Sequence, residues 1–416
     1  MGIFQSLAGL VVFLFLAWLI SENRGRFPLK TAVIGIGAQL GLAFILLKFP
    51  FFTKIFFYLN EAVLALEAST RAGTSFVFGY IGGGEKPFDV TNPQATFILA
   101  FQSLPLVLVI SALSAVLFYW NILPRIVKGF SWLLEKSLGL GGAEGLGVSA
   151  NIFVGMVESP LLIRPYVNRL SRSELFTLMA SGMATIAGTV LVLYATILDP
   201  VLSNVTGHIL TASIISAPAA IVVSKIMIPE TAHLTSGVLE APEPAYSAMD
   251  ALTRGTIQGI ELLLNIIAMI IVLVALVHLA NIILGIFPEV WGAPLTLERL
   301  LGWLMAPVVW LMGVPWNEAH IAGGLLGTKT VLNEFIAYVN MAKLPEGSLS
   351  EKSLLIMSYA LCGFANPGSL GIMIGGLGAM APKRRNEIVS LGLKSIIAGT
   401  VATCMTGAVV ALIQFL

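Results

Sequence analysis

Charged side chains are scarce in this chain of 416 residues: Asp, Glu, Lys and Arg make up 11%, whereas 57% of the residues are apolar. Ordinary globular domains carry about a quarter charged residues, so a soluble body of this size could not cover its surface. The formal net charge of +1 also offers no basic face for a phosphate backbone. These shortages exclude a soluble enzyme, a nucleic-acid-binding protein and a disordered scaffold.

Cysteine and histidine are rare as well. The two cysteines, Cys362 and Cys404, sit in apolar surroundings and offer neither a disulfide framework nor the spacing of metal ligands. The four histidines are scattered and form no HExxH motif. The sequence therefore predicts no disulfide and no histidine or cysteine metal centre.

Long apolar runs dominate what remains, and the mean hydropathy is +0.92. Residues 3–20 lack a basic segment before them and an A-x-A site after them, which favours a first transmembrane helix over a cleaved signal. Each run is near or above the ~20 residues that cross a bilayer. We therefore expect an all-α polytopic membrane protein with eight transmembrane helices, at 3–20, 31–48, 96–118, 174–198, 207–226, 258–286, 353–380 and 388–415.

Three further segments read as amphipathic helices that lie at the membrane interface. Residues 49–70 alternate aromatic side chains with Lys54, Glu61 and Glu67, and residues 119–140 and 289–313 look similar. An apolar face beside a charged face is typical of interfacial helices.

Two segments are too polar and too interrupted to be good single spans. Residues 142–170 contain GLGVSANIFVGMVESPLLIRPY. Residues 314–342, together with the preceding Gly313, contain GVPWNEAHIAGGLLGTKTVLNEF. Irregular backbone at membrane depth is tolerated only where protein buries it or water reaches it. We interpret both segments as re-entrant helical hairpins.

Basic residues suggest how these hairpins are oriented. If the basic clusters are cytoplasmic, both termini lie outside, the first hairpin enters from the cytoplasm, and the second, flanked by Lys329, Lys343 and Lys352, enters from outside. The clusters are Arg24, Arg26 and Lys30; Arg125, Lys128 and Lys136; Arg164, Arg169 and Arg172; and Lys383, Arg384 and Arg385.

Opposed hairpins indicate an inverted repeat. Tyr-Val-Asn ends each hairpin, at 166–168 and 338–340, and a break interrupts the span that follows each, at 185–188 and 364–368. In transporters built this way, substrate and ion sites lie near the bilayer midplane between broken helices.

Three acids stand in the hairpins: Glu158, Glu318 and Glu334. An acid at the bilayer centre costs about 2.5–3.5 kcal/mol on insertion scales, so something must solvate or pair it. Glu318, close to Trp316, is as easily structural as functional. Glu158 and Glu334 could accept hydrogen bonds from a neutral polar solute or carry a proton.

Several uncharged polar residues lie near the helix breaks. Each could merely cap a half-helix, but together with freed carbonyls they offer the hard oxygen ligands that suit an alkali cation. They are Asn151, Thr185, Asn333, Asn366 and Ser369.

Longer motifs in the same regions resemble the concentrative nucleoside transporters over essentially the whole chain. The motifs are GTSFVFG at 73–79, NIFVGMVESPLLIRPY at 151–166, TKTVLNEFIAY at 328–338, CGFANPGSLG at 362–371 and MAPKRR at 380–385. The resemblance implies a bacterial-length, secondary active symporter that imports nucleosides by alternating access. It also implies a homotrimer in the bacterial inner membrane, with both termini periplasmic on the topology above.

The resemblance further implies a division into scaffold and transport parts. Residues 1–140 would be mainly scaffold, 141–205 would carry the first hairpin and its broken helix, 206–313 would be partly scaffold, and 314–416 would be mainly transport domain.

It also assigns site residues, position by position. The nucleobase would contact Met156, Val157, Glu158 and Val190, and the ribose would contact Glu334, Phe364, Asn366 and Ser369. The coupling Na⁺ would be bound by the side chains of Asn151 and Thr185 and the main-chain carbonyls of Val154 and Ile186.

Departures from the family pattern bear on substrate choice. Many members have Gln then Thr where this chain has Met156 and Val157, so two side-chain hydrogen bonds to the base are lost. We therefore expect a preference for purine nucleosides such as adenosine, guanosine or inosine. Thr185 replaces a more common serine but keeps the hydroxyl, which favours Na⁺. The alternative is a proton-coupled symporter of broad or pyrimidine preference, with Glu158 or Glu334 as the proton carrier.

Overall fold

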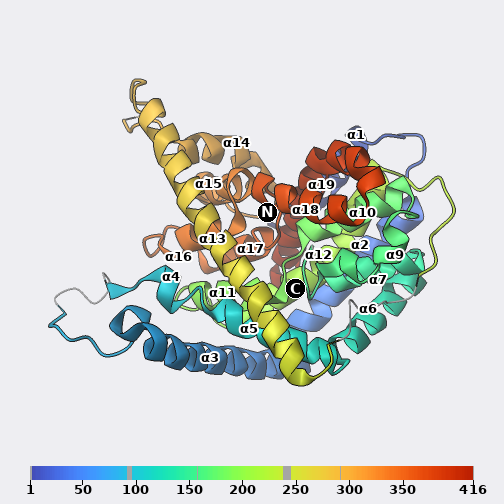
Figure 1. The fold of residues 1–416 in the computed structure, drawn as a ribbon. Coiled ribbons are helices and arrows are strands. Elements are labelled where there is room, and N and C mark those ends of the chain that lie inside the picture. The colour runs from blue at the N-terminus through green and yellow to red at the C-terminus, as the bar shows by residue number, and fades with distance from the viewer. Residues whose placement is uncertain (1, 91–95, 157, 238–244, 291, 416) are drawn as a thin grey trace.

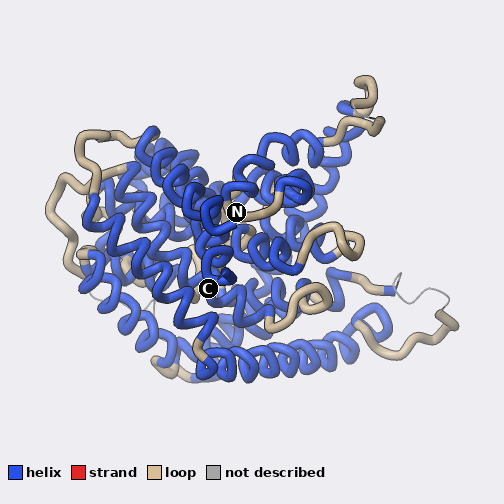
Figure 2. Tube along the Cα trace, turned by 180° about the vertical axis from the view of Figure 1, so that it is seen from behind, coloured by secondary structure: helices blue, strands red, loops and turns tan. Residues whose placement is uncertain are grey.

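The computed structural model describes residues 2–90, 96–156, 158–237, 245–290 and 292–415, and these form helices joined by short loops (Figure 2). Within those ranges there is no β-strand, only an isolated bridge between Val290 and Ala293. The expectation of an all-α chain is confirmed.

Seven helical spans among the described residues are long and apolar enough to cross a membrane, and they match seven of the eight predicted spans. The spans are α1 (Gly2–Leu19), α2 (Leu29–Lys48), α4 with α5 (Leu99–Gln102 and Leu106–Tyr119), α10 with α11 (Arg172–Ala184 and Gly188–Leu198), α12 (Val205–Met227), α13 (Ala248–Leu284) and α19 (Arg385–Phe415).

The eighth predicted span, 353–380, is divided into α17 (Glu351–Ala360) and α18 (Pro367–Met380). The two predicted mid-span breaks are therefore present, between α10 and α11 and between α17 and α18. A further pair, α14 (Leu297–Leu311) and α15 (Trp316–Val331), bends by 116° at its junction and is long enough together to form one span.

The segments predicted as interfacial or hairpin are also helical. The segments predicted as interfacial contain α3 (Pro50–Phe78), α6 (Ile122–Leu138) and α14. The first hairpin segment contains α7 (Gly142–Asn151), α8 (Glu158–Leu161) and α9 (Arg164–Val167). The second contains α15 and α16 (Glu334–Ala342). Short 3-10 turns, η1 (Gly79–Gly82) and η3 (Pro382–Arg384), complete the fold. In each hairpin segment, helices on the two sides of a turn pack against one another.

One prediction about these segments is wrong. Lys329 was counted among the sparse charges that flank the second hairpin, but it lies inside α15 and is fully buried. The ammonium is not a topological signal, because it is bonded inside the protein rather than exposed beside it.

The packing separates a central group of helices from an outer one. In the apolar windows of α10–α11, α12 and α19, 89–94% of residues are buried, whereas the corresponding window of α13 has none. Figure 1 shows α13 running diagonally across one face of the molecule. An apolar helix so exposed within one chain must be covered by lipid or protein, since water would leave its surface unsatisfied.

Loops that carry three of the four basic clusters meet at one end of the bundle. Arg172 bonds to Glu22 at 2.8 Å and to Glu387 at 3.4 Å, and Arg384 donates to the carbonyl oxygens of Val167 at 3.0 Å and Leu170 at 2.6 Å. The positive-inside rule requires these basic clusters to lie on the same side of the membrane, and their shared end of the bundle agrees with that prediction.

The hydrogen bond from Arg172, helped by Lys394, lowers the pKa of Glu22 to about 2. The Glu22 carboxylate therefore stays charged throughout the physiological range, and this contact between loops does not depend on pH there.

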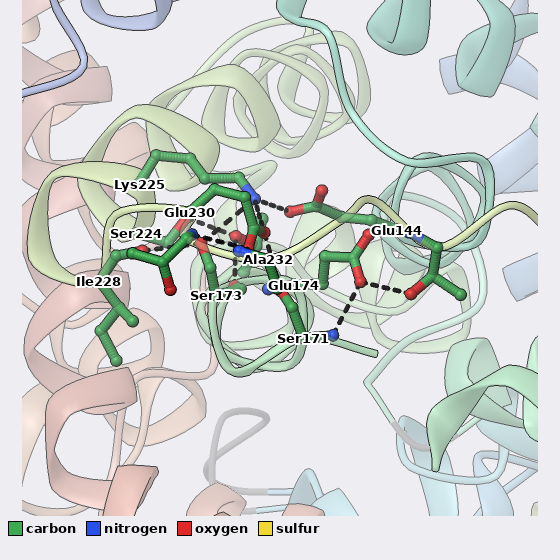
Figure 3. Close-up of polar contacts among 12 residues, drawn as sticks. Glu144, Ser171, Ser173, Glu174, Ser224, Lys225, Ile228, Glu230 and Ala232 are labelled. Carbon is green, nitrogen blue, oxygen red and sulfur yellow. Dashed lines mark hydrogen bonds and ion pairs between the residues drawn. The ribbon is translucent and has the colours of Figure 1, made fainter. Parts of the chain in front are cut away.

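A buried ion pair fixes the first hairpin segment to α12. Lys225 lies 2.8 Å from Glu144, whose side chain is fully buried, and 3.5 Å from the partly exposed Glu230 (Figure 3). Nearby, Glu174 completes a capping box with Ser171 at the start of α10. The Lys225 ammonium also donates to the Ser173 hydroxyl of α10 at 3.3 Å, so this one lysine joins α7, α10 and the end of α12.

We expect Lys225→Met to lower the free energy of unfolding by about 3–5 kcal/mol, because it leaves Glu144 as an unpaired buried charge. Adding Glu144→Leu should recover most of the loss. Denaturant unfolding of the purified protein in detergent measures both.

The matched control is Lys394→Met, which removes a partly exposed partner of Glu22 and should change stability by less than about 1 kcal/mol. Equal losses in the single and double variants would contradict the ion-pair explanation.

Candidate functional site

The two interrupted helices bring free backbone and polar side chains into the interior. α10 ends at Ala184, Thr185 follows as its C-cap in an extended conformation, and α11 begins at Gly188. α17 ends at Ala360, and Asn366 caps the start of α18. A hairpin segment lies beside each break: the amide N–H of Gly188 donates to Phe153 of the first at 2.8 Å, and the Asn366 side chain reaches Glu334 of the second at 2.8 Å.

A cavity of about 170 Å³ lies where these elements converge. It is lined by six of the eight residues predicted for substrate: Met156, Val190, Glu334, Phe364, Asn366 and Ser369. Val157 lies outside the described residues. Glu158 begins α8, and only its backbone position is described. The structure thus brings the two predicted halves of the substrate site to one place.

Among the described residues that line this cavity, Glu334 is the charged one. It is the first residue of α16, where the helix dipole favours negative charge. Its Oε1 accepts from the Tyr194 hydroxyl at 2.6 Å, and its Oε2 accepts from the Asn366 amide at 2.8 Å. Two neutral donors therefore hold the carboxylate in place, and a carboxylate has lone pairs left for a ligand.

Asn366 combines a structural role with a place in the site. Its Oδ1 accepts from the backbone N–H of Ser369 at 2.8 Å and caps α18. The cap fixes the amide so that Nδ2 points to Glu334. Capping and contact with the site, which sequence reasoning treated as competing explanations, are therefore compatible here.

Another part of the cavity lining, at Met156 and Val190, is apolar. Gly155 has φ +99°, a backbone conformation that favours glycine, and it precedes the nearly buried Met156. Met156 packs so closely on α10 that a Cβ at Gly182 would lie 2.8 Å from its own Cβ. Val190 completes this apolar wall, and the neighbouring Thr189 adds a hydroxyl to the cavity lining.

The predicted cation ligands lie beside the first break, next to the cavity. The Thr185 hydroxyl donates to the Asn151 carbonyl at 3.1 Å, and the Asn151 Nδ2 donates to Ser181 at 2.7 Å. The Asn151 Oδ1 is buried, and none of the described residues donates a hydrogen bond to it. A buried amide oxygen without a donor is costly, and it suits a hard cation such as Na⁺. The Val154 and Ile186 carbonyls belong to the same two turns.

Glu318 lies elsewhere. It is in the first turn of α15, and its carboxylate accepts from the Ser350 backbone N–H at 3.1 Å and hydroxyl at 3.0 Å. Ser350 caps α17, so Glu318 supports a helix start. It is not among the residues that line the cavity.

Sequence reasoning missed three polar residues of the cavity lining, Thr189, Tyr194 and Asn265. Tyr194 lies four residues after Val190 on α11, so helical spacing places both on one face. Asn265 is a lone amide in the most apolar stretch of α13. Polar residues inside an apolar span are costly and mark functional sites by default; that signal could have identified Asn265.

Comparison with known protein families finds three matches that together cover most of the chain. Residues 8–81 match the family described as Na⁺ dependent nucleoside transporter N-terminus, and residues 208–411 match its C-terminus. Residues 100–201 match a family described as nucleoside recognition.

Individual relatives align over nearly the whole of this chain. YutK of Bacillus subtilis, an uncharacterized transporter, is 38% identical over 98% of this chain and 99% of its own. Human solute carrier family 28 member 3 is 34% identical over 98% of this chain and 60% of its own.

The fold agrees as well. Structures of CNTnw in an inward-facing substrate-bound state and, as a variant, in an outward-facing state align at TM-scores of 0.90 and 0.91. Both are 34% identical and cover 100% of this chain and 98% of theirs. The chain therefore belongs to the concentrative nucleoside transporters, a family of membrane transporters and not of enzymes.

Proposed function

We propose that this protein is a Na⁺-driven symporter that imports nucleosides, with a preference for purine nucleosides, by alternating access. The observation that carries the proposal is the cavity in which Glu334, on one hairpin segment, and Met156, on the other, face a common space between two broken helices.

The ribose binds on the Glu334 side. Ribose hydroxyls are donors that need acceptors, and the Glu334 carboxylate, already oriented by Tyr194 and Asn366, supplies them. Hydrogen bonds to a charged acceptor contribute about 1.5–3 kcal/mol each. Ser369, whose backbone is tied to Asn366, adds a hydroxyl at the same end.

The base binds against the apolar wall of Met156 and Val190, while Phe364 contacts the ribose. This wall cannot replace the hydrogen bonds that a small pyrimidine loses on leaving water. A bicyclic purine buries more apolar area there and gains roughly 25 cal/mol for each Å² removed from water. The larger gain from apolar burial therefore favours purine over pyrimidine nucleosides.

The coupling ion is a co-substrate and binds at the first break. Asn151 Oδ1 and the Thr185 hydroxyl supply side-chain oxygens, and Val154 and Ile186 supply carbonyls. Carbonyl dipoles and half-helix ends suit Na⁺ without any carboxylate.

Alternating access moves the two hairpin segments together. An apolar surface of α13 lines the outer side of the cavity, formed by Leu262, Ile266 and Ile270. The hairpin segments can slide along this surface with few hydrogen bonds to break. Residues 141–205 and 314–416 form most of the moving part, and residues 1–140 with part of 206–313 form the scaffold of a homotrimer in the bacterial inner membrane. Both hairpin segments are re-entrant from opposite sides.

Purine preference is tested by competition. In proteoliposomes with an inward Na⁺ gradient, unlabelled inosine, guanosine and adenosine should inhibit uptake of labelled adenosine more strongly than uridine or cytidine. Met156→Gln should improve inhibition by uridine about tenfold, since it restores a hydrogen-bonding side chain worth about 1–1.5 kcal/mol.

The control is Met249→Gln, an exposed position at the start of α13. A uridine inhibition constant that Met156→Gln leaves unchanged would refute the assignment of the base wall.

Na⁺ coupling is tested with Asn151→Leu, which removes the unpartnered amide oxygen. We expect the Na⁺ concentration for half-maximal uptake to rise at least about tenfold, because the variant loses one oxygen contact to the cation, comparable in energy to a hydrogen bond with a charged group. Asn168→Leu, at an exposed asparagine of the same segment, should leave it unchanged. Wild-type uptake that follows a pH gradient and ignores Na⁺ would instead support the proton-coupled alternative.

Glu334→Ala should abolish uptake, and Tyr194→Phe should raise the KM about tenfold by removing one hydrogen bond to the carboxylate. Tyr338→Phe is the matched control, because its hydroxyl, equally buried, donates to the Ser358 carbonyl rather than to Glu334. Equal KM values in the two tyrosine variants would argue against Glu334 as the ribose acceptor.

A further inference from the structure

The second hairpin segment holds a buried cation that the substrate site does not use. Lys329 of α15 is 0% exposed, and its ammonium donates to the Ala360 carbonyl at 2.8 Å and the Thr403 hydroxyl at 2.7 Å. Lys225, the other buried lysine discussed above, pairs with carboxylates. Lys329 forms no ion pair within the described parts of the chain, so neutral oxygens alone bind its charge.

This contact has a counterpart at the candidate Na⁺ site, in the other half of the predicted repeat. Ser171 caps α10 and Ser350 caps α17. Counted from the first helical residue, Ser181 is the tenth residue of α10 (from Arg172) and Ala360 the tenth of α17 (from Glu351). Asn151, which ends the first arm of one hairpin segment, bonds to Ser181.

Lys329 lies near the end of the first arm of the other hairpin segment, two residues before Val331, and bonds to Ala360. In each half, the first arm thus contacts the last turn of the half-helix that follows.

Physical chemistry explains why a cation suits both places. The last carbonyls of a helix have no intrahelical donor and form the negative end of its dipole. At the end of α10 the protein offers the unpartnered Asn151 Oδ1. At the end of α17 it offers the Ala360 carbonyl and the Thr403 hydroxyl, and Thr403 packs against Gly363 in the break itself.

Lys329 also balances charge. Glu334 is within electrostatic range of it, and the carboxylate is otherwise held by the neutral donors Tyr194 and Asn366. A buried carboxylate needs a compensating charge as well as hydrogen bonds. The ammonium supplies it from within the same hairpin segment.

We propose that Lys329 is a tethered cation. Its ammonium permanently fills, in the second half, the position that an exchangeable alkali cation takes in the first, so that each chain has one coupling site and not two. This deepens the proposed function and rests on it.

The test uses chemical rescue. Lys329→Ala removes three carbons and the ammonium, which n-propylammonium supplies as a free cation and 1-propanol supplies as a neutral analogue. We expect uptake of labelled adenosine by Lys329→Ala proteoliposomes to fall at least tenfold, and n-propylammonium, but not 1-propanol, to restore it at least fivefold. The control Lys343→Ala, at an exposed lysine after α16, should transport like the wild type under all conditions.

A second readout is the Na⁺ dependence. If Na⁺ enters the vacated position, the Hill coefficient of Lys329→Ala uptake should rise from near one towards two. Absence of both the cation-specific rescue and the rise in Hill coefficient would overturn the proposal.

If the alanine variant does not fold, Lys329→Met provides a second test, because its side chain is neutral and of similar length to lysine. Uptake within twofold of the wild type would overturn the tethered cation, and a tenfold or greater loss in a folded protein would support it. A wild-type protein that fails to take up any nucleoside would instead refute the proposed function, whatever the Lys329 variants do.

Discussion

An interrupted helix in an apolar interior leaves backbone carbonyls and N–H groups without partners, and the rest of this structure depends on how those groups are satisfied. The breaks after Thr185 and after Ala360 are each covered by a hairpin segment that brings polar side chains to them. Asn366 caps one new helix start and Asn333 another. The cavity lies where these caps meet.

The same constraint explains why the site contains little charge. Glu334 is held by a hydroxyl and an amide rather than by a direct ion pair within the described residues, and so it keeps a high capacity to accept from a ligand. A carboxylate locked in a bidentate pair would have less capacity left. Charge is instead concentrated away from the cavity, in the Lys225–Glu144 pair that fixes the first hairpin segment.

Motifs made much of this predictable. Apolar length located the spans, Gly, Pro and Asn located the breaks, and the family resemblance selected Met156, Glu334 and Asn366, which the fold brings together. Tyr194 could not be found this way, because its contact with Glu334 joins residues 140 positions apart. Lys329 was misread as a flanking charge because sequence shows a lysine's charge but not its burial.

One short stretch of backbone links the two proposed ligands. Thr185 and Ile186 belong to the proposed cation site, while Ala187 and Val190, directly after them, line the cavity. Gly188 ties this stretch to the first hairpin segment, and a Cβ there would lie 2.7 Å from the Phe153 carbonyl oxygen. Ordering the turn for one ligand therefore orders the wall for the other, and linkage makes the effect reciprocal. Coupling between ion and nucleoside needs no long path through the protein, because both would bind to the same turn.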